Sequence, residues 1–199
     1  NTRLMGAFNI SNMTAAVGGS LALGIPGAEI EAAVPGVTAP PGRLETYRAR
    51  NGQRVVIDYA HTDHALETAL MALRPHTRGS LWCVFGCGGN RDTAKRPAMG
   101  AVAERLADQV VLTDDNPRDE DPAGIVEQIL AGMDSPDQVW VIHDRREAIA
   151  TVVGQAGGDD LVLVAGKGHE RVQERAGERV PFSDVDVVTE LLENGGDSQ

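Results

Sequence analysis

Short apolar runs alternate with amphipathic segments along the chain from residue 54 onward. Five of these runs predict strands: RVVID (54–58), LWCVFG (81–86), QVVLT (109–113), QVWVIH (138–143) and LVLVAG (161–166). Most of them are continuously apolar rather than alternating, as is typical of strands that are covered on both faces. The pattern therefore predicts an α/β fold, with a Rossmann-like, mostly parallel sheet and flanking helices.

Two of the segments between these runs carry helix start signals. Thr62 or Asp63 can cap a helix that runs to about Leu73. The apolar side chains of this segment fall on one helical face: Leu66, Ala69, Leu70 and Leu73. Asp121 followed by Pro122 places a capping carboxylate before a proline at the first helical position. These signals predict structure and require no function.

Residues 1–40 differ in character from the rest of the chain. Residues 8–26 predict a helix of small residues that ends near Gly24 and Pro26, and residues 32–43 are rich in proline and glycine, as linkers are. We therefore expect one unit over residues 1–40 and a second over residues 41–199. The opening NTRLMG is neither a signal peptide nor an initiator methionine, so we expect the chain to be part of a longer one.

The charge and the cysteines narrow the classes of partner. The formal net charge of −11 disfavours nucleic acid and anionic membranes, because both need basic patches on the protein. No apolar run in the sequence is long enough for a membrane span. Cys83 and Cys87 lie too close for an ordinary long-loop disulfide and have no second Cys/His pair for a zinc site. A reducing cytoplasm is the expected location, with both cysteines in the core or in turns.

Polar residues follow each predicted strand, where an open parallel sheet binds its ligands. The segments after the five runs contain DYAH, GCGGNRD, DDNPR, HD and GKGHE. GCGGNRD lacks the Gly-Lys-Ser/Thr of a Walker loop, and Arg91 stands where a dinucleotide fingerprint needs glycine. From these residues alone, GCGGNRD and GKGHE remain either ligand-binding turns or ordinary turns with solvated Arg91, Lys167 and Glu170. For DYAH, a capping Asp58 with a surface His61 is the more frequent case.

Seven motifs in a fixed order add a family resemblance: FNISN, GRLE, DYAHT, FGCGGNRD, KRPAMG, DDNPR and AGKGHE. Together they resemble the muramyl-peptide ligases, and among these the members that add meso-diaminopimelate during peptidoglycan synthesis. The resemblance covers the family's C-terminal α/β domain and the end of its central ATPase domain. It implies that residues 1–40 are a remnant of the ATPase domain with its linker, and that residues 41–199 are the amino-acid-binding domain. The sequence contains no Gly-Lys-Thr loop, so the chain alone is not expected to turn over ATP.

The resemblance implies an ATP-dependent acid–amino-acid ligase. In the family, ATP phosphorylates the D-glutamyl carboxylate of a UDP-muramoyl dipeptide, and the amine of the incoming amino acid attacks the acyl phosphate. The implied substrates are ATP, the UDP-muramoyl dipeptide and meso-diaminopimelate. Mg²⁺ is the implied cofactor, with its ligands expected mainly in a central domain outside this sequence. The N-terminal and central domains of the same protein are the implied partners.

The resemblance also assigns site residues by position. It implies contacts with meso-diaminopimelate for seven residues: Arg91, Asp115, Asn116, Pro117, Arg118, Gly166 and Glu170. It implies nucleotide contacts for four: Asn9, Asn12, Arg43 and Asp58. It places Asp58 and His61 in the catalytic cleft, and it implies no metal ligand in this chain.

Arg118 gives the choice of amino acid a chemical reason. The end of diaminopimelate remote from the reacting amine carries a carboxylate and an ammonium, and the Arg118 guanidinium can fork onto that carboxylate. Lysine lacks the carboxylate, so bound lysine would leave Arg118 desolvated without a partner. The acids around Arg118 in residues 113–122, TDDNPRDEDP, are expected either to take the ammonium or to hold the rotamer of Arg118.

Three other functions stay open on the sequence. A lysine-adding ligase of the same family is the nearest, and Arg118 argues against it. The absence of a Walker loop would suit a non-catalytic amino-acid-binding module with this fold. A dinucleotide-dependent oxidoreductase would need the glycine that Arg91 replaces.

Overall fold

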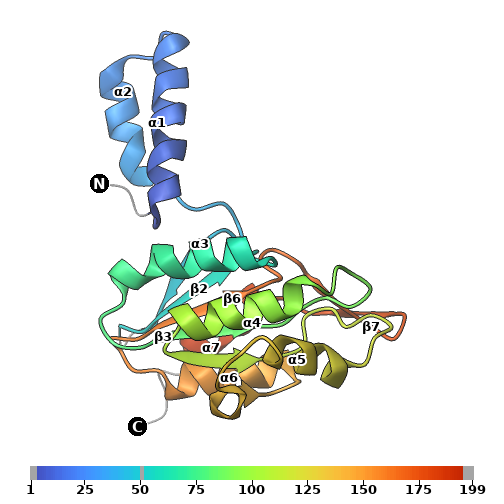
Figure 1. Cartoon of the computed structure of the whole chain (residues 1–199). Coiled ribbons are helices and arrows are strands. Elements are labelled where there is room, and N and C mark those ends of the chain that lie inside the picture. Colours follow the sequence, from blue (N-terminus) through green and yellow to red (C-terminus); the bar gives the residue numbers. More distant parts are fainter. Residues whose placement is uncertain (1–3, 50–51, 195–199) are drawn as a thin grey trace.

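A six-stranded, mostly parallel sheet forms the centre of the computed structural model, which describes residues 4–49 and 52–194 (Figure 1). The strand order is β1-β2-β6-β3-β4-β5, with β1 antiparallel at one edge and the others parallel. The strands span Glu45–Arg48 (β1), Arg54–Asp58 (β2), Leu81–Phe85 (β3), Gln109–Leu112 (β4), Trp140–Val141 (β5) and Leu161–Ala165 (β6). All five predicted strands and the parallel α/β fold are confirmed, although β1 was not predicted.

Helices cover both faces of this sheet (Figure 1). One face carries α3 (Asp63–Leu73), α4 (Lys95–Leu106) and α5 (Pro122–Leu130), and the other carries α6 (Arg145–Gln155) and α7 (Asp184–Asn194). Each face has its own apolar core, because successive strand residues point to opposite sides. In β2, Val56 belongs to the core under α3 and α4, whereas Val55 and Ile57 belong to the core under α6 and α7. This double cover explains the continuously apolar strands.

The predicted helix starts are confirmed. Thr62 Oγ1 caps α3 by accepting a hydrogen bond from the Ala65 amide at 3.2 Å, and Asp121 caps α5 through the Ala123 amide at 3.3 Å. The predicted apolar face of α3 is buried at all its positions. Short 3-10 helices lie at Val34–Gly36, Arg74–His76 and Pro136–Gln138.

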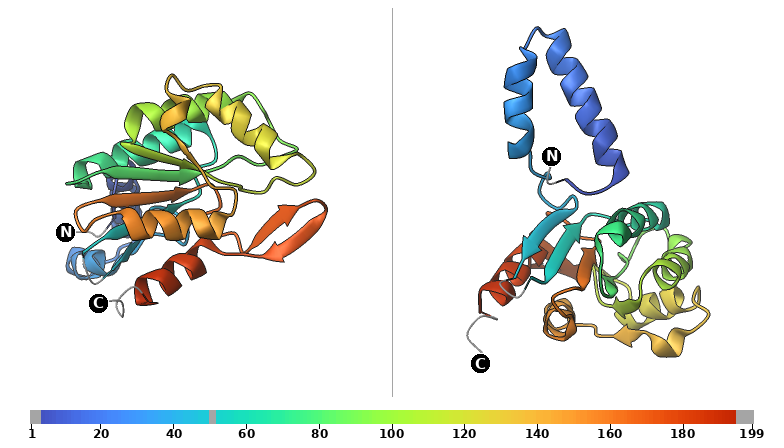
Figure 2. Two further views of the ribbon diagram at one scale, coloured as in Figure 1. Left: turned by 90° about the horizontal axis from the view of Figure 1, so that it is seen from below. Right: turned by 90° about the vertical axis from the view of Figure 1, so that its left-hand side faces the viewer.

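A helical hairpin near the N-terminus stands away from the sheet (Figure 2). Its first helix, α1 (Ala7–Ala22), confirms the predicted small-residue helix and ends just before Gly24, whose φ is +81°. Its second helix, α2 (Gly27–Ala33), was not predicted, because it is short and leads into the proline-rich stretch. Neither helix contains a buried residue. No helix in the described part of the chain is long and apolar enough to span a membrane.

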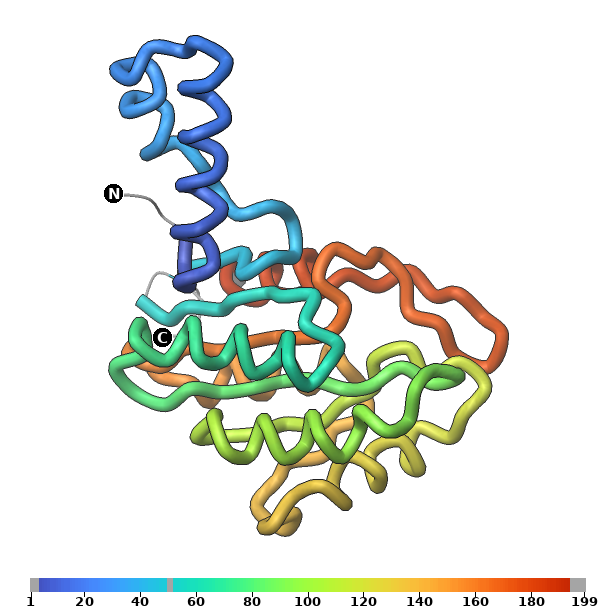
Figure 3. The backbone as a smooth tube through the Cα atoms, turned by 45° about the horizontal axis from the view of Figure 1, so that its top comes forward, coloured from blue at the N-terminus to red at the C-terminus, as the bar shows by residue number. Residues whose placement is uncertain are grey.

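A second hairpin, β7 (Val172–Arg175) and β8 (Glu178–Pro181), forms a separate two-stranded sheet. It lies beside the loop that follows β4 (Figure 3), and a single bridge joins Arg118 to Arg175. The sequence did not predict this hairpin, because half of its strand residues are charged and its strands are exposed or half-buried. It nevertheless completes the candidate site described below.

Candidate functional site

The carboxyl ends of four neighbouring parallel strands, β2, β6, β3 and β4, bring the polar segments of the sequence to one edge of the sheet. Asp58 ends β2, and the loops after β3, β4 and β6 begin at residues 86, 113 and 166. The polar residues that the sequence placed after separate strands therefore lie together. This edge is the candidate active site.

Glycines allow the loops after β3 and β4 to pack against each other. A Cβ on Gly86 would lie 2.0 Å from the Thr113 carbonyl oxygen, and a Cβ on Gly89 would lie 1.9 Å from the Pro117 carbonyl oxygen. Any larger residue would clash with backbone at both positions. The glycines of GCGGNRD thus serve the contact between two loops.

A buried lysine organises the centre of the site. Lys167 Nζ donates to Asn116 Oδ1 at 2.9 Å and to Glu170 Oε2 at 3.0 Å, and its side chain is fully buried. Asn116 Nδ2 donates to the same Glu170 oxygen at 2.9 Å. Burial raises the pKa of Glu170, but these hydrogen bonds and the charges of Lys167 and Arg118 outweigh burial and lower that pKa. The alternative of an ordinary turn with a solvated Lys167 is therefore wrong.

Arg118 is held by the β7–β8 hairpin and by the loop after β3. Its Nε donates to Glu174 Oε2 and its Nη1 donates to the Gly89 carbonyl, both at 2.8 Å. Its backbone lies in the left-handed region, with φ +53°, where residues other than glycine are uncommon. The Arg118 amide donates to the Glu174 carbonyl at 3.0 Å, and the Arg118 carbonyl accepts from the Ala176 amide at 2.6 Å. The hairpin thus fixes both the backbone and the side chain of Arg118.

The acids of residues 113–122 do not hold Arg118, so that part of the expectation is wrong. Asp114 Oδ1 accepts a hydrogen bond from His143 Nδ1 at 2.8 Å, and Glu120 pairs with the buried Arg96 at 2.8 Å. The acid on Arg118 is Glu174, which is 56 residues further along the chain. The acid that pairs with Arg118 therefore comes from a distant hairpin and not from the neighbouring residues in the sequence.

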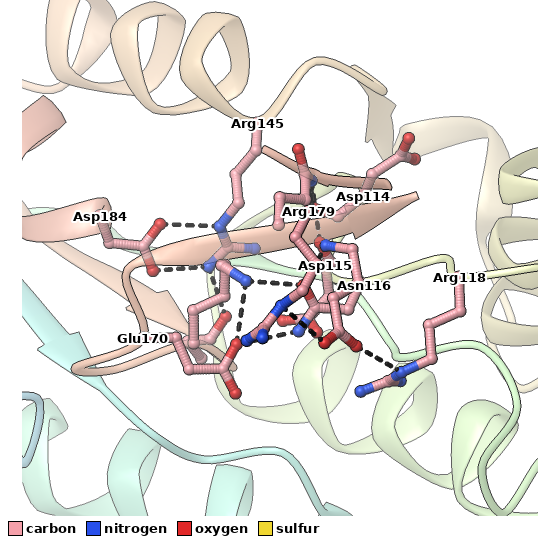
Figure 4. A network of polar contacts seen from close by, with 12 residues as sticks. Asp114, Asp115, Asn116, Arg118, Arg145, Glu170, Arg179 and Asp184 are labelled. Atoms are coloured by element: carbon pink, nitrogen blue, oxygen red, sulfur yellow. Dashed lines mark hydrogen bonds and ion pairs between the residues drawn. The ribbon is translucent and has the colours of Figure 1, made fainter. Parts of the chain in front are cut away.

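A fully buried ion pair lies beneath the site (Figure 4). Arg145, at the start of α6, donates from Nε and Nη2 to the two carboxylate oxygens of Asp184 at 2.8 Å each. Arg145 Nη2 also donates to the Ala165 carbonyl at 2.9 Å, at the end of β6. The pair therefore ties the starts of α6 and α7 to the strand end that leads into the GKGHE turn.

Asp115 stands at the base of the site, and one of its oxygens is unpaired. Its Oδ2 is buried and has no hydrogen-bond partner among the described residues. Burial raises the pKa of Asp115, and the charges of Arg145 and Lys167 oppose this rise. A Cβ on Gly166 would lie 2.7 Å from Asp115 Oδ2, and Gly166 has a φ of +116°, so both space and backbone demand glycine there. This oxygen is a hydrogen-bond acceptor that the described residues leave unused.

A cavity of about 290 Å³ lies between α1 and the start of α3. Apolar side chains form part of its wall: Phe8, Pro40, Leu44, Ala65 and Ala69. Polar side chains form the rest: Asn9, Asn12, Arg43, Asp58 and Thr68. All four residues for which the resemblance implies nucleotide contacts thus line one cavity. Apolar walls with a few polar groups are typical of small-molecule sites.

Asp58 supports the turn that carries Arg43. Asp58 Oδ2 accepts a hydrogen bond from the Leu44 amide at 2.8 Å. Burial raises the pKa of Asp58, although hydrogen bonds from the Leu44 and Ala60 amides and the charge of Arg43 oppose the rise. The Arg43 guanidinium lies 5.0 Å from the centre of the Tyr59 ring, within range of a cation–π contact. The GRLE turn and the DYAH segment therefore form one unit.

His61 has a defined tautomer when it is neutral. Its Nδ1 lies 2.8 Å from the Tyr59 carbonyl oxygen, which can only accept a hydrogen bond, so Nδ1 carries the proton. Nε2 is then free to accept a proton. The His61 carbonyl accepts a hydrogen bond from Lys95 Nζ at 2.7 Å, which anchors the segment to the start of α4.

The GRLE turn touches the GKGHE turn. A Cβ on Gly42 would lie 2.3 Å from the His169 amide nitrogen, and a Cβ on Gly168 would lie 2.8 Å from Tyr59 Cβ. Both glycines have positive φ, +66° and +53°. The Tyr59 and His169 rings are 5.5 Å apart between centroids. The cavity and the Asn116–Glu170 cluster are thus neighbouring parts of one site.

Arg91 lies at the exposed rim of this site. A Cβ on Gly88 would lie 3.0 Å from Arg118 Nη1 and 3.8 Å from Arg91 Cγ, so both arginines border the same glycine.

No group of three or more His, Cys, Asp and Glu side chains among the described residues could hold a metal ion. Cys83 and Cys87 are buried and free, and burial raises the pKa of each thiol to about 12.

Sequence reasoning missed several side chains that shape the site. Lys167 and Tyr59 lie inside the motifs GKGHE and DYAH, but only other residues of these motifs were assigned ligand contacts from the sequence. Glu174, Arg145 and Asp184 stand in segments without a motif, and only the folded chain brings them to the strand ends. A buried arginine cannot be told from an exposed one by sequence alone.

Comparisons with known proteins agree with this geometry. Residues 42–168 match the family described as "Mur ligase, glutamate ligase domain". A UDP-N-acetylmuramoyl-L-alanyl-D-glutamate–2,6-diaminopimelate ligase of Ectopseudomonas mendocina is 51% identical over 191 residues, which cover 96% of this chain and 39% of that protein. A solved structure of an enzyme with the same name superposes with a TM-score of 0.81 at 41% identity, over all of this chain and 41% of the other.

A more distant solved structure is that of the Mycobacterium tuberculosis folylpolyglutamate synthase complexed with ADP and AMPPCP. It superposes with a TM-score of 0.64 at 25% identity, over 83% of this chain and 38% of the other. This chain spans about 39% of the length of the diaminopimelate ligase from Ectopseudomonas mendocina. The chain belongs to the Mur ligase family, on the match of residues 42–168 to the family's glutamate ligase domain.

Proposed function

We propose that this chain is the C-terminal part of an ATP-dependent ligase that adds meso-diaminopimelate to UDP-N-acetylmuramoyl-L-alanyl-D-glutamate in peptidoglycan synthesis. One observation carries the proposal: Arg118 and the Asn116–Glu170 pair lie at the strand ends beside a cavity with the residues expected for a nucleotide. The name of the 51% identical relative supports it. In this proposal residues 1–40 are the end of a central ATPase domain, and residues 41–199 form the amino-acid domain.

The amino-acid site recognises both charges at the remote end of diaminopimelate. Arg118 receives the remote carboxylate with the guanidinium edge that Glu174 and Gly89 leave free, and Arg91 at the rim adds a second positive charge. The remote ammonium donates to Glu170 and to the unpaired Asp115 Oδ2. Pro117 and Gly166 fix the two backbones around it. Asn116 and Lys167 keep Glu170 ionised for this contact.

The cavity beside α1 receives the base and ribose of the nucleotide. The side-chain amides of Asn9 and Asn12 supply donors and acceptors for polar edges, and the apolar wall covers the flat ring. Arg43 offers its charge to a phosphate. Asp58 positions Arg43 through the Leu44 amide. The folylpolyglutamate synthase structure is a complex with ADP and AMPPCP, and its similarity to this chain supports this part of the proposal.

The reaction joins the two neighbouring parts of the site. The γ-phosphoryl group of ATP passes to the D-glutamyl carboxylate and gives an acyl phosphate. The amine nitrogen attacks the acyl carbon, the bond from that carbon to the phosphate oxygen breaks, and phosphate leaves. The attacking ammonium must first lose a proton, and we assign its removal to His61 Nε2, because Nδ1 already donates to the Tyr59 carbonyl. Packing between the GRLE and GKGHE turns holds the reactants in register.

Mg²⁺ is part of the family chemistry, but we assign it no ligand among the described residues, which offer no cluster of metal-binding side chains. The ion would neutralise charge on the transferring phosphates when bound. In this proposal its ligands come from the rest of the ligase. We place the reaction in the cytoplasm, which suits two free, buried thiols.

Calorimetric titration of the 199-residue chain tests the proposal directly. Meso-diaminopimelate should bind at the Arg118 site, L-lysine should bind at least tenfold more weakly, and ADP should bind independently at the cavity. Arg43→Ala should weaken ADP and leave diaminopimelate unchanged. Tighter binding of L-lysine would favour a lysine-adding ligase, and equal binding of the two amino acids would show that Arg118 does not select between them. Binding of diaminopimelate without any ADP binding would favour a non-catalytic amino-acid module.

A further inference from the structure

Three arginines line a second concavity, at the end of the sheet opposite to the candidate active site. Arg48 ends the antiparallel β1, Arg54 begins β2, and Arg78 precedes β3, so all three lie at the amino ends of the parallel strands. The concavity has a volume of about 680 Å³. Its other lining residues are Gly52, Pro75, His76, Gly158 and Asp159. No role proposed above uses any of these residues.

The three guanidinium groups lack anionic partners among the described residues. In the part of the chain that the structure describes, no carboxylate lies within ion-pair distance of Arg48, Arg54 or Arg78. Two exposed arginines elsewhere do find partners: Arg105 pairs with Glu67, and Arg146 pairs with Glu190. The chain has a net charge of −11, so acidic side chains are in excess, yet none pairs with the three arginines gathered here.

The arginines also repel one another. Arg48 and Arg54 are direct cross-strand partners in the β1–β2 register, where like charges destabilise a sheet. Arg54 donates to the His76 carbonyl, which is a neutral acceptor. Burial lowers the pKa of Arg54, the charges of Arg48 and Arg78 lower it further, and Asp159 opposes them. A bound anion would remove this repulsion.

We propose that this concavity is a binding site for a phosphate-bearing anion, with the guanidinium groups of Arg48, Arg54 and Arg78 as its ligands. Guanidinium forks match phosphate oxygens in pairs, which point-like charges do not. Three arginines less one aspartate leave the lining a net charge of +2 with His76 neutral. The volume lies within the usual range for small-molecule sites. Gly52 and Gly158 leave part of the wall without side chains, so a ligand can approach the backbone there.

This binding is independent of the ligase reaction, because the two sites lie at opposite ends of the sheet. NMR titration of the 199-residue chain with pyrophosphate tests it. The amides of Gly52 and Gly158 should shift in a saturable manner at constant ionic strength. Arg54→Gln and Arg78→Gln should each weaken this binding at least tenfold. Arg146→Gln removes the same charge from a paired arginine and should leave it unchanged.

Two outcomes of the titration would overturn the proposal. One is an equal response of all variants, or the same shifts when chloride replaces pyrophosphate at matched ionic strength. The other is a response confined to Gly166 and Gly168, which would locate the anion at the active-site end. Melting curves provide a second readout that does not depend on a weak affinity. Without anion, Arg78→Gln should melt above the wild type, and pyrophosphate should raise the melting temperatures of the wild type and of Arg146→Gln more than that of Arg78→Gln. A lower melting temperature for this variant would contradict the repulsion on which the site depends.

Discussion

Replacing Arg118 with alanine should change which amino acid the complete ligase prefers. The side chain is 22% exposed, and Glu174 and Gly89 occupy its Nε and Nη1. The rest of the guanidinium is available for the remote carboxylate of diaminopimelate. A hydrogen bond to a charged group contributes about 1.5–3 kcal/mol, so its loss should lower kcat/KM for diaminopimelate roughly 10- to 150-fold. Lysine has no such carboxylate, and its kcat/KM should stay the same or rise.

Amino-acid-dependent phosphate release measures both values in one assay. The ratio of the two kcat/KM values is the informative quantity, because a loosened β7–β8 hairpin would lower both together. Arg179→Ala is the matched control: Arg179 contacts the same Glu174 at 3.5 Å but is 70% exposed on β8. It should leave the ratio unchanged. An Arg118→Ala enzyme that loses activity equally with both amino acids would show that Arg118 only supports the loop, and the account of selectivity would fail.

Three further substitutions test the buried residues that support the site. Gly166→Ala should lower the melting temperature and weaken diaminopimelate binding, because its Cβ would meet Asp115 Oδ2 at 2.7 Å with φ at +116°. Asp115→Asn should raise the melting temperature, although it should also weaken diaminopimelate binding. Burial raises the pKa of Asp115 in the folded state, so its ionised form costs folding free energy, and this cost appears as pH rises through the raised pKa. The melting temperature should therefore rise at pH 7 and change less at pH 4. Arg145→Met should cost about 3–5 kcal/mol of unfolding free energy, because it leaves Asp184 buried and unpaired, and Arg145→Met with Asp184→Leu should recover most of that loss.

Denaturant unfolding and thermal melts provide the measurements, with a control for each. Gly154 on α6 has open space around its Cβ position, so Gly154→Ala should not destabilise the fold. An Asp115→Asn protein that is less stable at pH 7 would contradict the assigned burial cost. If the double substitution is as unstable as Arg145→Met, the unpaired charge of Asp184 is not the cause of the loss. The hydrogen bond from Arg145 to the Ala165 carbonyl would then account for it.

The main elements of the fold could be predicted because local rules and burial agree in this chain. Continuously apolar runs gave the parallel strands, and Thr62 and Asp121 marked helix starts that the structure confirms. The β7–β8 hairpin escaped prediction because its strands are exposed or half-buried and contain no apolar run, and α2 escaped because it is short. Neither element contains a buried residue, so the sequence shows no apolar periodicity by which they could be predicted.

The candidate site was predictable only as far as its motifs reached. The strand-end rule brought Asp58, Asn116 and Glu170 to one edge, where the structure also has them. The partner of Arg118 was not predictable, because Glu174 reaches it from a hairpin without sequence signals. Lys167 was expected to be solvated in an ordinary turn as often as not, and its full burial depends on the acceptors that the fold provides. Sequence patterns do not indicate which side chains pair when they are far apart along the chain.

Phosphate release by the complete ligase, with UDP-N-acetylmuramoyl-L-alanyl-D-glutamate and ATP, tests the central claim most directly. The assay is run with meso-diaminopimelate, with L-lysine and with no amino acid. The account predicts release that depends on diaminopimelate and is at least tenfold less efficient with lysine. Release at the same rate with all three additions would contradict it, because the Arg118 turn would then select no substrate.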